Sequence, residues 1–531
     1  MNRLFLLPAL LMPMLLSAQQ GFMPLSHVID GGLTARMHAW KAPGHSAVRP
    51  YARQDAALFA PDTSGPRALL PVLDRWAADS ARVRFGPLVD LQAGLDAGQD
   101  PATTHRLGGG LWLDADAGRH VTFHLDGMAW NERFPSYLDS LVRSTRMSPG
   151  EGYAYKVGDA RSHYEVNGYV DVAAGKYFRF TLGRGKHFIG EGMRSLFLSD
   201  NTYSYPYFKI TTTAWHIRYV NLFTRMSDIR GAGGDPTRNL RKFASFHYLS
   251  WNISKRVNAG LFEAIVWQDN DPAYPRGFDI NYLNPAVFLR PVEFSLGSPD
   301  NALLGFAFNV KVGRRTLLYS QLMLDEFLKD NVQAGTGWAG NKQAFQLGVV
   351  AHGAFGAKPL TLRGEFNYVR PFMYTHSDTR QNYSHAGEPL AHPYGSNFWE
   401  ALVQGEWRKD RWLVRELFSA ALMGQDTSNA PNSSYGSNIF LPENSRPLRD
   451  STHYENYGFY VGDPLAVTIL HNDLSIGYLV APRSGMMVEL GWTLRSRSPD
   501  AGGGLTNFIR LGVSAYFRDR HAVQEPRYVL D

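Results

Sequence analysis

The chain has 531 residues and no cysteine, which excludes a disulfide scaffold, a thiolate metal site and a cysteine nucleophile. After residue 18, no uninterrupted apolar run approaches the ~20 residues that a membrane-spanning helix needs, so a multi-span helical protein is not expected. Charged residues are scarce at 19%, and 54 Lys and Arg nearly balance 48 Asp and Glu, which gives no argument for nucleic-acid binding. The 44% hydrophobic content can bury a large core, so a disordered chain is not expected either.

The first eighteen residues have the pattern of a secretory signal peptide. Arg3 supplies a positive start, residues 4–16 are almost wholly apolar, and Ser17 and Ala18 form a small-residue cleavage site. The run is too short and too interrupted by proline to span a bilayer as a helix. We therefore expect residues 1–18 to be removed and the mature protein to leave the cytoplasm.

Residues 19–80 differ in pattern from the rest of the chain. They are interrupted by Pro and Gly up to about residue 66, and residues 67–82 then place apolar side chains near helical spacing. A second helix is expected over residues 135–146. We interpret 19–80 as an N-terminal periplasmic or plug-like segment.

From about Val83 the hydrophobic period changes to two. Leu490 and Trp492 alternate with Glu489 and Arg495, and similar segments of about ten residues recur to the end of the chain. This is the length of a tilted strand that crosses a bilayer, with one apolar and one polar face. Arg363, Arg495 and Lys311 are expected to point inward, because an Arg at the lipid-facing midplane costs ~2–4 kcal/mol.

Short turns alternate with long connections along this region. Turns such as 254–258, 313–315, 408–411 and 482–485 separate long loops at roughly 185–210, 268–300, 325–343, 371–397 and 424–460. This asymmetry is typical of outer-membrane barrels. The sequence predicts an all-β fold, a transmembrane antiparallel β-barrel of about 16–18 strands over residues 81–518, followed by a C-terminal tail at 519–531. A soluble all-β protein would also alternate, although no repeat of a propeller type is visible.

Motifs for catalysis or cofactor binding are weak. Gly183-Arg184-Gly185-Lys186 lacks the spacing of a phosphate-binding loop, and Ser195 is not in a nucleophile elbow. His376, His385 and His392 share one loop region but have no metal-site spacing. We predict no enzyme activity, no catalytic residue, no cofactor and no metal.

The long loops are rich in aromatic and amide side chains. Trp338 lies among glycines, and Tyr383 and Tyr435 belong to loops with many Tyr, Asn and Ser residues. Aromatic planes can stack on sugar rings, and amides and hydroxyls can bind sugar hydroxyls. The same residues are also ordinary loop residues and membrane-interface anchors.

Several stretches together resemble a known family. They are GRGKHFIGEGMRSLFLSDNTYSYPYFKITT (183–212), YLNPAVFLRPVEFSLGSPDNALLG (282–305), GWAGNKQAFQLG (337–348), FNYVRPFMYTHS (366–377), PLAHPYGSNFWE (389–400) and HSAVRPY (45–51). Their order is similar to that in outer-membrane proteins of the RemB gliding-motility group, within the broader Wzi-like capsule-assembly family.

The resemblance implies an eighteen-stranded outer-membrane barrel with helical elements on its periplasmic side. It implies a surface lectin that holds capsular polysaccharide in the Wzi-type branch, a mobile surface protein in the RemB branch, and enzyme activity in neither. Within the shared motifs and the loops, the candidate contacts to a glycan or a partner are Trp338, Tyr383, His392, Asn397, Tyr435, Lys186, Arg194, Asp200, Arg290, Glu293, Asp300 and Asn301. The alternative is that the polar ones hold loops in the lumen by hydrogen bonds and ion pairs.

Three functions follow as expectations, all at the cell outer membrane with the lipid bilayer as a partner and no nucleic acid. The first is a non-enzymatic barrel that binds, assembles or anchors surface polysaccharide. The second is a gliding or adhesion component that contacts gliding-machinery proteins. The third is a passive porin, since a barrel of this size can conduct when its lumen is open.

Overall fold

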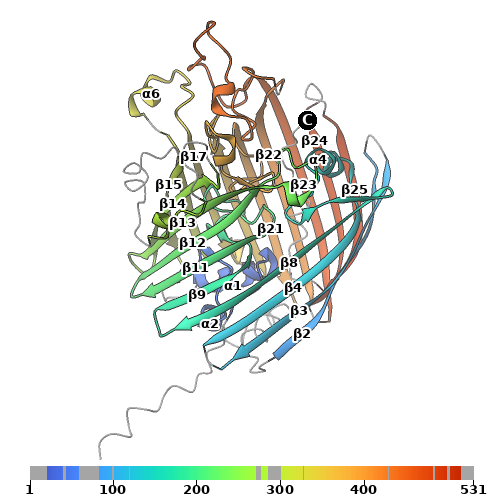
Figure 1. The fold of residues 1–531 in the computed structure, drawn as a ribbon. Coiled ribbons are helices and arrows are strands. Elements are labelled where there is room, and N and C mark those ends of the chain that lie inside the picture. The colour runs from blue at the N-terminus through green and yellow to red at the C-terminus, as the bar shows by residue number, and fades with distance from the viewer. Residues whose placement is uncertain are drawn as a thin grey trace, which may run out of the picture.

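The protein is a closed antiparallel β-barrel (Figure 1). The computed structural model describes residues 21–39, 44–58, 83–98, 101–118, 120–270, 277–284, 300–326, 328–428, 430–481, 485–498 and 503–515. Within these ranges, eighteen strands form the wall, and β2 closes it by pairing with β25. They are β2 Val83–Asp96, β3 Ala102–Ala117, β4 Val121–Arg133, β8 Ala160–Ala174, β9 Phe178–Gly185, β11 Tyr205–Ala214, β12 Ile217–Asp228, β13 Leu240–Asn252, β14 Val257–Gln268, β15 Asn301–Val312, β16 Thr316–Leu324, β17 Gln343–His352, β18 Leu360–Val369, β21 Phe398–Lys409, β22 Trp412–Gln425, β23 Leu465–Ala481, β24 Met486–Arg497 and β25 Leu505–Ala515.

The remaining described elements are short and lie in the connections or near the chain start. The helices are α1 His27–Ala39, α2 Arg53–Leu58, α4 Ser136–Thr145 and α6 Lys329–Ala334, with 3₁₀ turns at Pro236–Arg238, Ile280–Leu283, Ala354–Gly356, Thr379–Gln381 and Glu443–Ser445. The small strands are β1 Val48–Arg49, β5 Met147–Ser148, β6 Gly152–Tyr153, β7 Tyr155–Val157, β10 Phe188–Ile189, β19 Ser384–His385 and β20 Glu388–Pro389. None of the described helices is long and apolar enough to cross a bilayer. Helix α4 confirms the helix expected over 135–146. The signal peptide, the helix expected over 67–82 and the tail at 519–531 lie outside the described residues.

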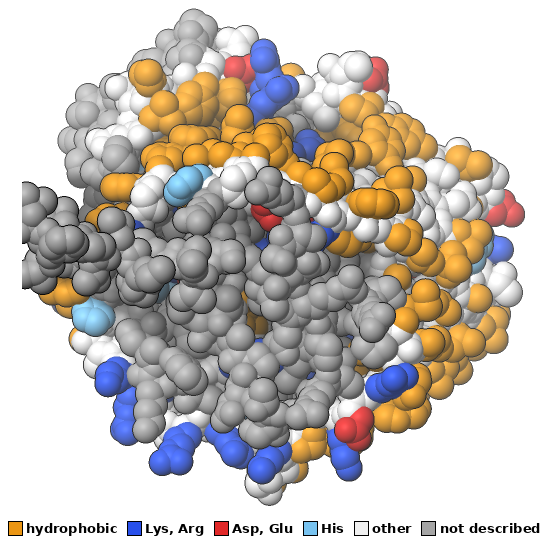
Figure 2. Space-filling model, turned by 90° about the horizontal axis from the view of Figure 1, so that it is seen from below, with side chains coloured by type: hydrophobic (Ala, Val, Ile, Leu, Met, Phe, Trp, Pro, Cys, Tyr) orange, Lys and Arg blue, Asp and Glu red, His pale blue; other side chains and the backbone are white. Residues whose placement is uncertain are grey.

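The predicted alternation fixes which way the strand side chains point. On β24 and β25, Leu490 and Leu511 are more than half exposed on the outer wall, whereas Glu489 and Arg510 are buried inside. Arg510 donates to both carboxylate oxygens of Asp473 at 2.9 Å, so the inward charge is neutralised. Figure 2, seen from below, shows apolar side chains around the outer wall and Lys and Arg side chains along part of its rim.

The three cations that were expected to point inward do so. Arg363 donates to the Glu191 carbonyl at 2.6 Å, and Lys311 donates to the Met37 carbonyl at 2.9 Å. Arg495 is buried beside the Tyr137 ring, 5.1 Å from its centroid. The free-energy cost of placing a charged side chain against lipid therefore predicted the direction of these side chains correctly.

Strands β12–β14 depart from the simple pattern. Asn221, His247 and Glu263 stand on their outward faces, yet all three are buried. Part of the β14–β15 connection folds back against this wall, because the Ser245 hydroxyl donates to the Tyr282 carbonyl at 3.0 Å. A loop that covers the outer wall lets polar side chains occupy outward positions, which strand periodicity does not reveal.

The lumen is filled from both ends. From the long-loop end, the β9–β11 and β18–β21 connections turn inward, and the Tyr383 hydroxyl donates to the Phe197 carbonyl at 2.6 Å while Phe197 stacks on Phe262 of the wall at 4.8 Å. From the short-turn end, α1 and α2 lie inside the barrel (Figure 1), where Asp55 pairs with Arg218 of β12 at 2.7 Å. The protein is therefore a plugged barrel, and its long loops mark the extracellular end.

Candidate functional site

Two extracellular loops lie side by side at the long-loop end of the barrel. The Phe459 amide donates to the Gly337 carbonyl at 3.0 Å, and the Gly458 amide donates to the Thr336 carbonyl at 2.9 Å. These backbone bonds join the β16–β17 connection to the β22–β23 connection. They hold the aromatic residues of both loops in one place.

Five aromatic residues of these loops form what we call the aromatic face: Trp338, Tyr435, Tyr454, Tyr457 and Tyr460. The last three are 37%, 48% and 48% exposed, whereas Trp338 and Tyr435 are half-buried. Such rings offer apolar planes beside hydroxyl and indole hydrogen-bonding groups. The face can therefore contact a ligand that has both apolar C–H surfaces and hydroxyls.

Arg370, the residue after β18, links the two loops by hydrogen bonds to their backbone carbonyls. Its guanidinium donates to the carbonyls of Asn341 at 2.9 Å, Phe459 at 3.2 Å and Trp338 at 3.3 Å. A guanidinium suits this role because its fixed fork of donors can reach several carbonyls at once. Sequence reasoning did not single out Arg370, although it lies within one of the motifs that carry the family resemblance.

An ion pair makes a second tie between the same connections. Lys342, buried just before β17, pairs with Glu443 of the β22–β23 connection and with Glu326 at 3.3 Å. Burial opposes the charge on Lys342, but the neighbouring carboxylates outweigh it and raise its pKa. Burial alone would raise the pKa of Glu443, but the positive charge of Lys342 outweighs this effect and lowers that pKa below its usual value.

Four of the sequence-predicted candidates are buried in the plug. Arg194 forms a bidentate pair with Glu400 at 3.0 and 3.1 Å, and His392 Nε2 lies 2.8 Å from the same carboxylate. Burial lowers the pKa of His392 to about 4 despite this carboxylate, so the ring is neutral at pH 7. Tyr383 and Asn397 are likewise fully buried, and Asn397 donates to the Asp463 carbonyl at 2.7 Å.

The remaining predicted candidates are dispersed. Lys186 donates to the Gly150 carbonyl at 2.5 Å, and Asp200 is half-buried. Asp300 accepts from the Tyr282 hydroxyl at 2.6 Å, and Asn301 donates to the Gln381 carbonyl at 2.9 Å. Arg290 and Glu293 lie outside the described residues. Of the twelve candidates, the structure brings Trp338 and Tyr435 to the aromatic face.

One cluster of possible metal ligands occurs among the described residues: Glu132, Glu151 and His163, all buried. It does not involve the three loop histidines considered from the sequence. Arg106 already donates to Glu132 and, at 2.6 Å, to Glu151. A guanidinium inside the cluster supplies the positive charge that an ion would otherwise provide, so we assign the cluster to lumen packing.

The closed wall, its apolar outer band and its asymmetric connections define an outer-membrane β-barrel protein. Among solved structures, the fold is similar to that of Wzi, described as an outer-membrane protein involved in group 1 capsule assembly in Escherichia coli and as a carbohydrate-binding β-barrel. The TM-score is 0.58 at 12% identity, and the match covers 93% of this chain and 99% of that one. Pseudomonas aeruginosa OprD gives a TM-score of 0.43 at 11% identity over 81% of this chain and 94% of that one.

The likeness to Wzi shows the fold. No family model matches the chain, and no curated protein matches it.

Proposed function

We propose that this protein is a non-enzymatic outer-membrane barrel that binds surface polysaccharide and helps to anchor it to the cell. The observation that carries the proposal is the aromatic face, which two loops hold together at the extracellular end of a plugged barrel. The description of Wzi as carbohydrate-binding supports the same ligand class. In the proposed complex, sugar rings stack on the tyrosines while loop amides and hydroxyls bind sugar hydroxyls.

The direct test is retention of the producing cell's own polysaccharide by the purified protein in detergent. The double variant Tyr457→Ala/Tyr460→Ala is expected to bind at least about tenfold more weakly, which corresponds to ~1.4 kcal/mol. Tyr177→Ala is the matched control, because Tyr177 is 46% exposed in a turn at the opposite end of the barrel. Heat-modifiable gel mobility verifies that each variant is folded. Folded wild-type protein without affinity for the polysaccharide would overturn the proposal.

The cellular test separates anchoring from binding. In a deletion strain, cell-attached polysaccharide is expected to fall and released polysaccharide to rise, with complementation restoring both. An unchanged partition would remove the anchoring part of the proposal.

The gliding or adhesion function rests on the resemblance of the sequence motifs to the RemB group and remains a prediction. Normal colony spreading and surface attachment by the deletion strain would count against it. The porin alternative is not favoured, because loops and N-terminal helices occupy the lumen.

A further inference from the structure

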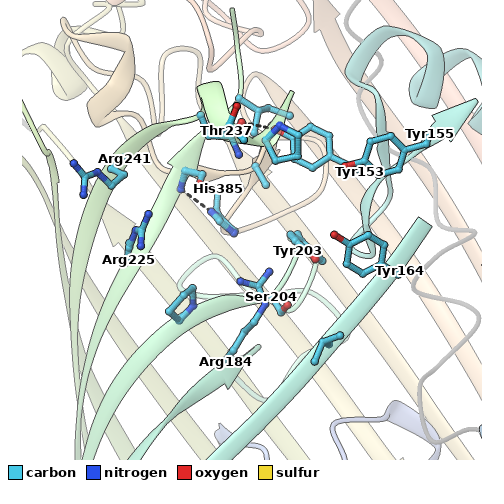
Figure 3. A pocket seen from close by; sticks show the side chains of 17 residues that line it. Tyr153, Tyr155, Tyr164, Arg184, Tyr203, Ser204, Arg225, Thr237, Arg241 and His385 are labelled. Atoms are coloured by element: carbon cyan, nitrogen blue, oxygen red, sulfur yellow. Dashed lines mark hydrogen bonds between the residues drawn. The ribbon is translucent and has the colours of Figure 1, made fainter. Parts of the chain in front are cut away.

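The barrel wall has an opening near its extracellular end, beside two short strands. Strands β9 and β11 have 8 and 10 residues, whereas the adjacent β8 and β12 have 15 and 12. The β8–β9 pairing ends at Gly168 and Arg184, and the β11–β12 pairing ends at Tyr207 and Thr224. The upper parts of β8 and β12 therefore border a cavity of about 780 Å³, which we call the lateral notch (Figure 3).

The lining of the lateral notch is cationic. Arg184, Arg225 and Arg241 line it from β9, β12 and β13, and no Asp or Glu does so among the described residues. Arg184 and Arg225 form no ion pair with any carboxylate that the structure describes, and Arg241 pairs with Asp269 at 2.7 Å while remaining 56% exposed. Guanidiniums that line one cavity without a carboxylate in its lining favour an anionic ligand, and their planar donors match the oxygens of a phosphate.

Tyrosine side chains form another part of the lining of the lateral notch. Tyr153, Tyr155, Tyr164 and Tyr203 line the lateral notch, and Arg184 lies over the Tyr203 ring at 4.7 Å. Figure 3 shows Tyr164 and Tyr155 on the side opposite Arg225 and Arg241, with Arg184 between them. Aromatic planes and phenolic hydroxyls beside guanidiniums suit a sugar that carries phosphate.

The position of the notch on the outer wall indicates where its ligand comes from. On the outer face of β9, apolar Phe178, Phe180 and Leu182 precede Arg184, and Phe178 and Leu182 are exposed on the outer wall. Two residues along a strand advance ~7 Å, so Arg184 lies one step above the apolar side chains of its own strand, at the point where the β8–β9 pairing ends. The notch therefore lies on the outward, lipid-facing side of the wall, toward its extracellular end.

We propose that the lateral notch binds the phosphorylated sugar headgroup of an outer-leaflet glycolipid. Arg184 and Arg225 bind the phosphate, and Tyr164 and Tyr203 contact the sugar. A membrane lipid is favoured over a free polysaccharide chain because the notch lies on the outward, lipid-facing side of the wall, toward its extracellular end. This site is separate from the aromatic face, so it does not depend on the proposed polysaccharide function.

The test measures lipid retention by the purified full-length barrel in detergent, using native mass spectrometry. Diphosphoryl lipid A and fully dephosphorylated lipid A are the probes. Wild-type protein is expected to retain the phosphorylated probe at least tenfold better than the dephosphorylated one. The double variant Arg184→Gln/Arg225→Gln is expected to lose this preference.

The matched control is Arg256→Gln/Arg314→Gln, which removes the same charge from exposed turns at the opposite end and should stay within twofold of wild type. Heat-modifiable mobility again verifies folding. Equal retention of both probes by wild type, or unchanged retention by the notch variant, would overturn the proposal. It would also be overturned if the notch variant lost acidic polysaccharide but kept lipid A.

Discussion

At the scale of single residues, the lumen is held by buried ion pairs whose partners come from distant parts of the chain. Arg194 lies in the β9–β11 connection and Glu400 lies on β21, and both side chains are at most 2% exposed. A buried pair of this kind is costly to break, since removal of one partner leaves an uncompensated charge in a low-dielectric site. Arg194 therefore positions the plug against the wall.

Arg194→Met tests this positioning role. The variant should lower the free energy of unfolding by about 3–5 kcal/mol, because Glu400 would remain buried without its cation. The measurement is the denaturant midpoint of the heat-modifiable band in detergent. Arg143→Met is the control, because Arg143 is 71% exposed in its i,i+4 pair with Asp139, and its loss should cost less than about 1 kcal/mol. Equal effects of the two variants would contradict the assignment.

The sequence correctly predicted the direction of side chains on strands, where the alternation fixes it. It did not predict the direction of side chains in loops. Arg363 and Arg495 could be placed inside because their apolar neighbours on alternate positions had to face lipid. No such rule applies to Tyr383 or Trp338, both in connections, and the structure buries the first while leaving the second half-exposed. Loop direction depends on partners far away in the sequence.

At the scale of elements, the extracellular connections act as one unit because polar ties join them. The Lys342–Glu443 pair joins the β16–β17 connection to the β22–β23 connection that carries most of the aromatic face. Since the folded-state pKa of Glu443 is lowered, its contribution to stability is present above the ordinary carboxyl pKa. That contribution is lost as the pH falls through the lowered folded-state value.

Glu443→Gln is therefore expected to destabilise the protein by about 1–3 kcal/mol at pH 7, because Lys342 keeps only its other carboxylate neighbours. The difference from wild type should shrink as the pH falls below about 4. Thermal unfolding of both proteins across this pH range checks the expectation. Glu326→Gln is the companion variant, and its effect should be smaller because Glu326 is 48% exposed. A difference that stayed constant with pH would show that Glu443 acts through packing alone.

Strand lengths were harder to predict than strand existence. The alternating segments identified the strands. The turn expected at 313–315 falls between β15 and β16, whereas the turn expected at 254–258 overlaps the first two residues of β14. The expected loop at 185–210 extended into β11, which starts at Tyr205. The end of a strand depends on where its neighbours stop pairing, and the lateral notch arises from that feature.

At the scale of the whole molecule, a barrel of eighteen strands is wide enough to conduct ions, but its lumen is plugged. The observed number of strands lies within the predicted range of about 16–18, because the period and length of each segment are local properties of the sequence. The charged interior and the long loops predict a plugged lumen. The contacts that close it could not be predicted, such as those of Tyr374 and Tyr383 with the carbonyls of Leu196 and Phe197, at 2.9 and 2.6 Å.

A plugged lumen predicts that the wild-type protein shows no steady conductance in planar bilayers. Tyr374→Phe/Tyr383→Phe removes two hydroxyls that hold the β18–β21 connection to the β9–β11 connection, and it keeps both rings in the core. The variant should show intermittent openings, because each buried carbonyl loses a bond worth about 1 kcal/mol. Tyr319→Phe is the control, since that hydroxyl donates to Glu365 on the wall at 2.8 Å and does not join the two connections. A steady wild-type current would instead mean that the plug leaves a continuous water path, and the porin function would then regain support.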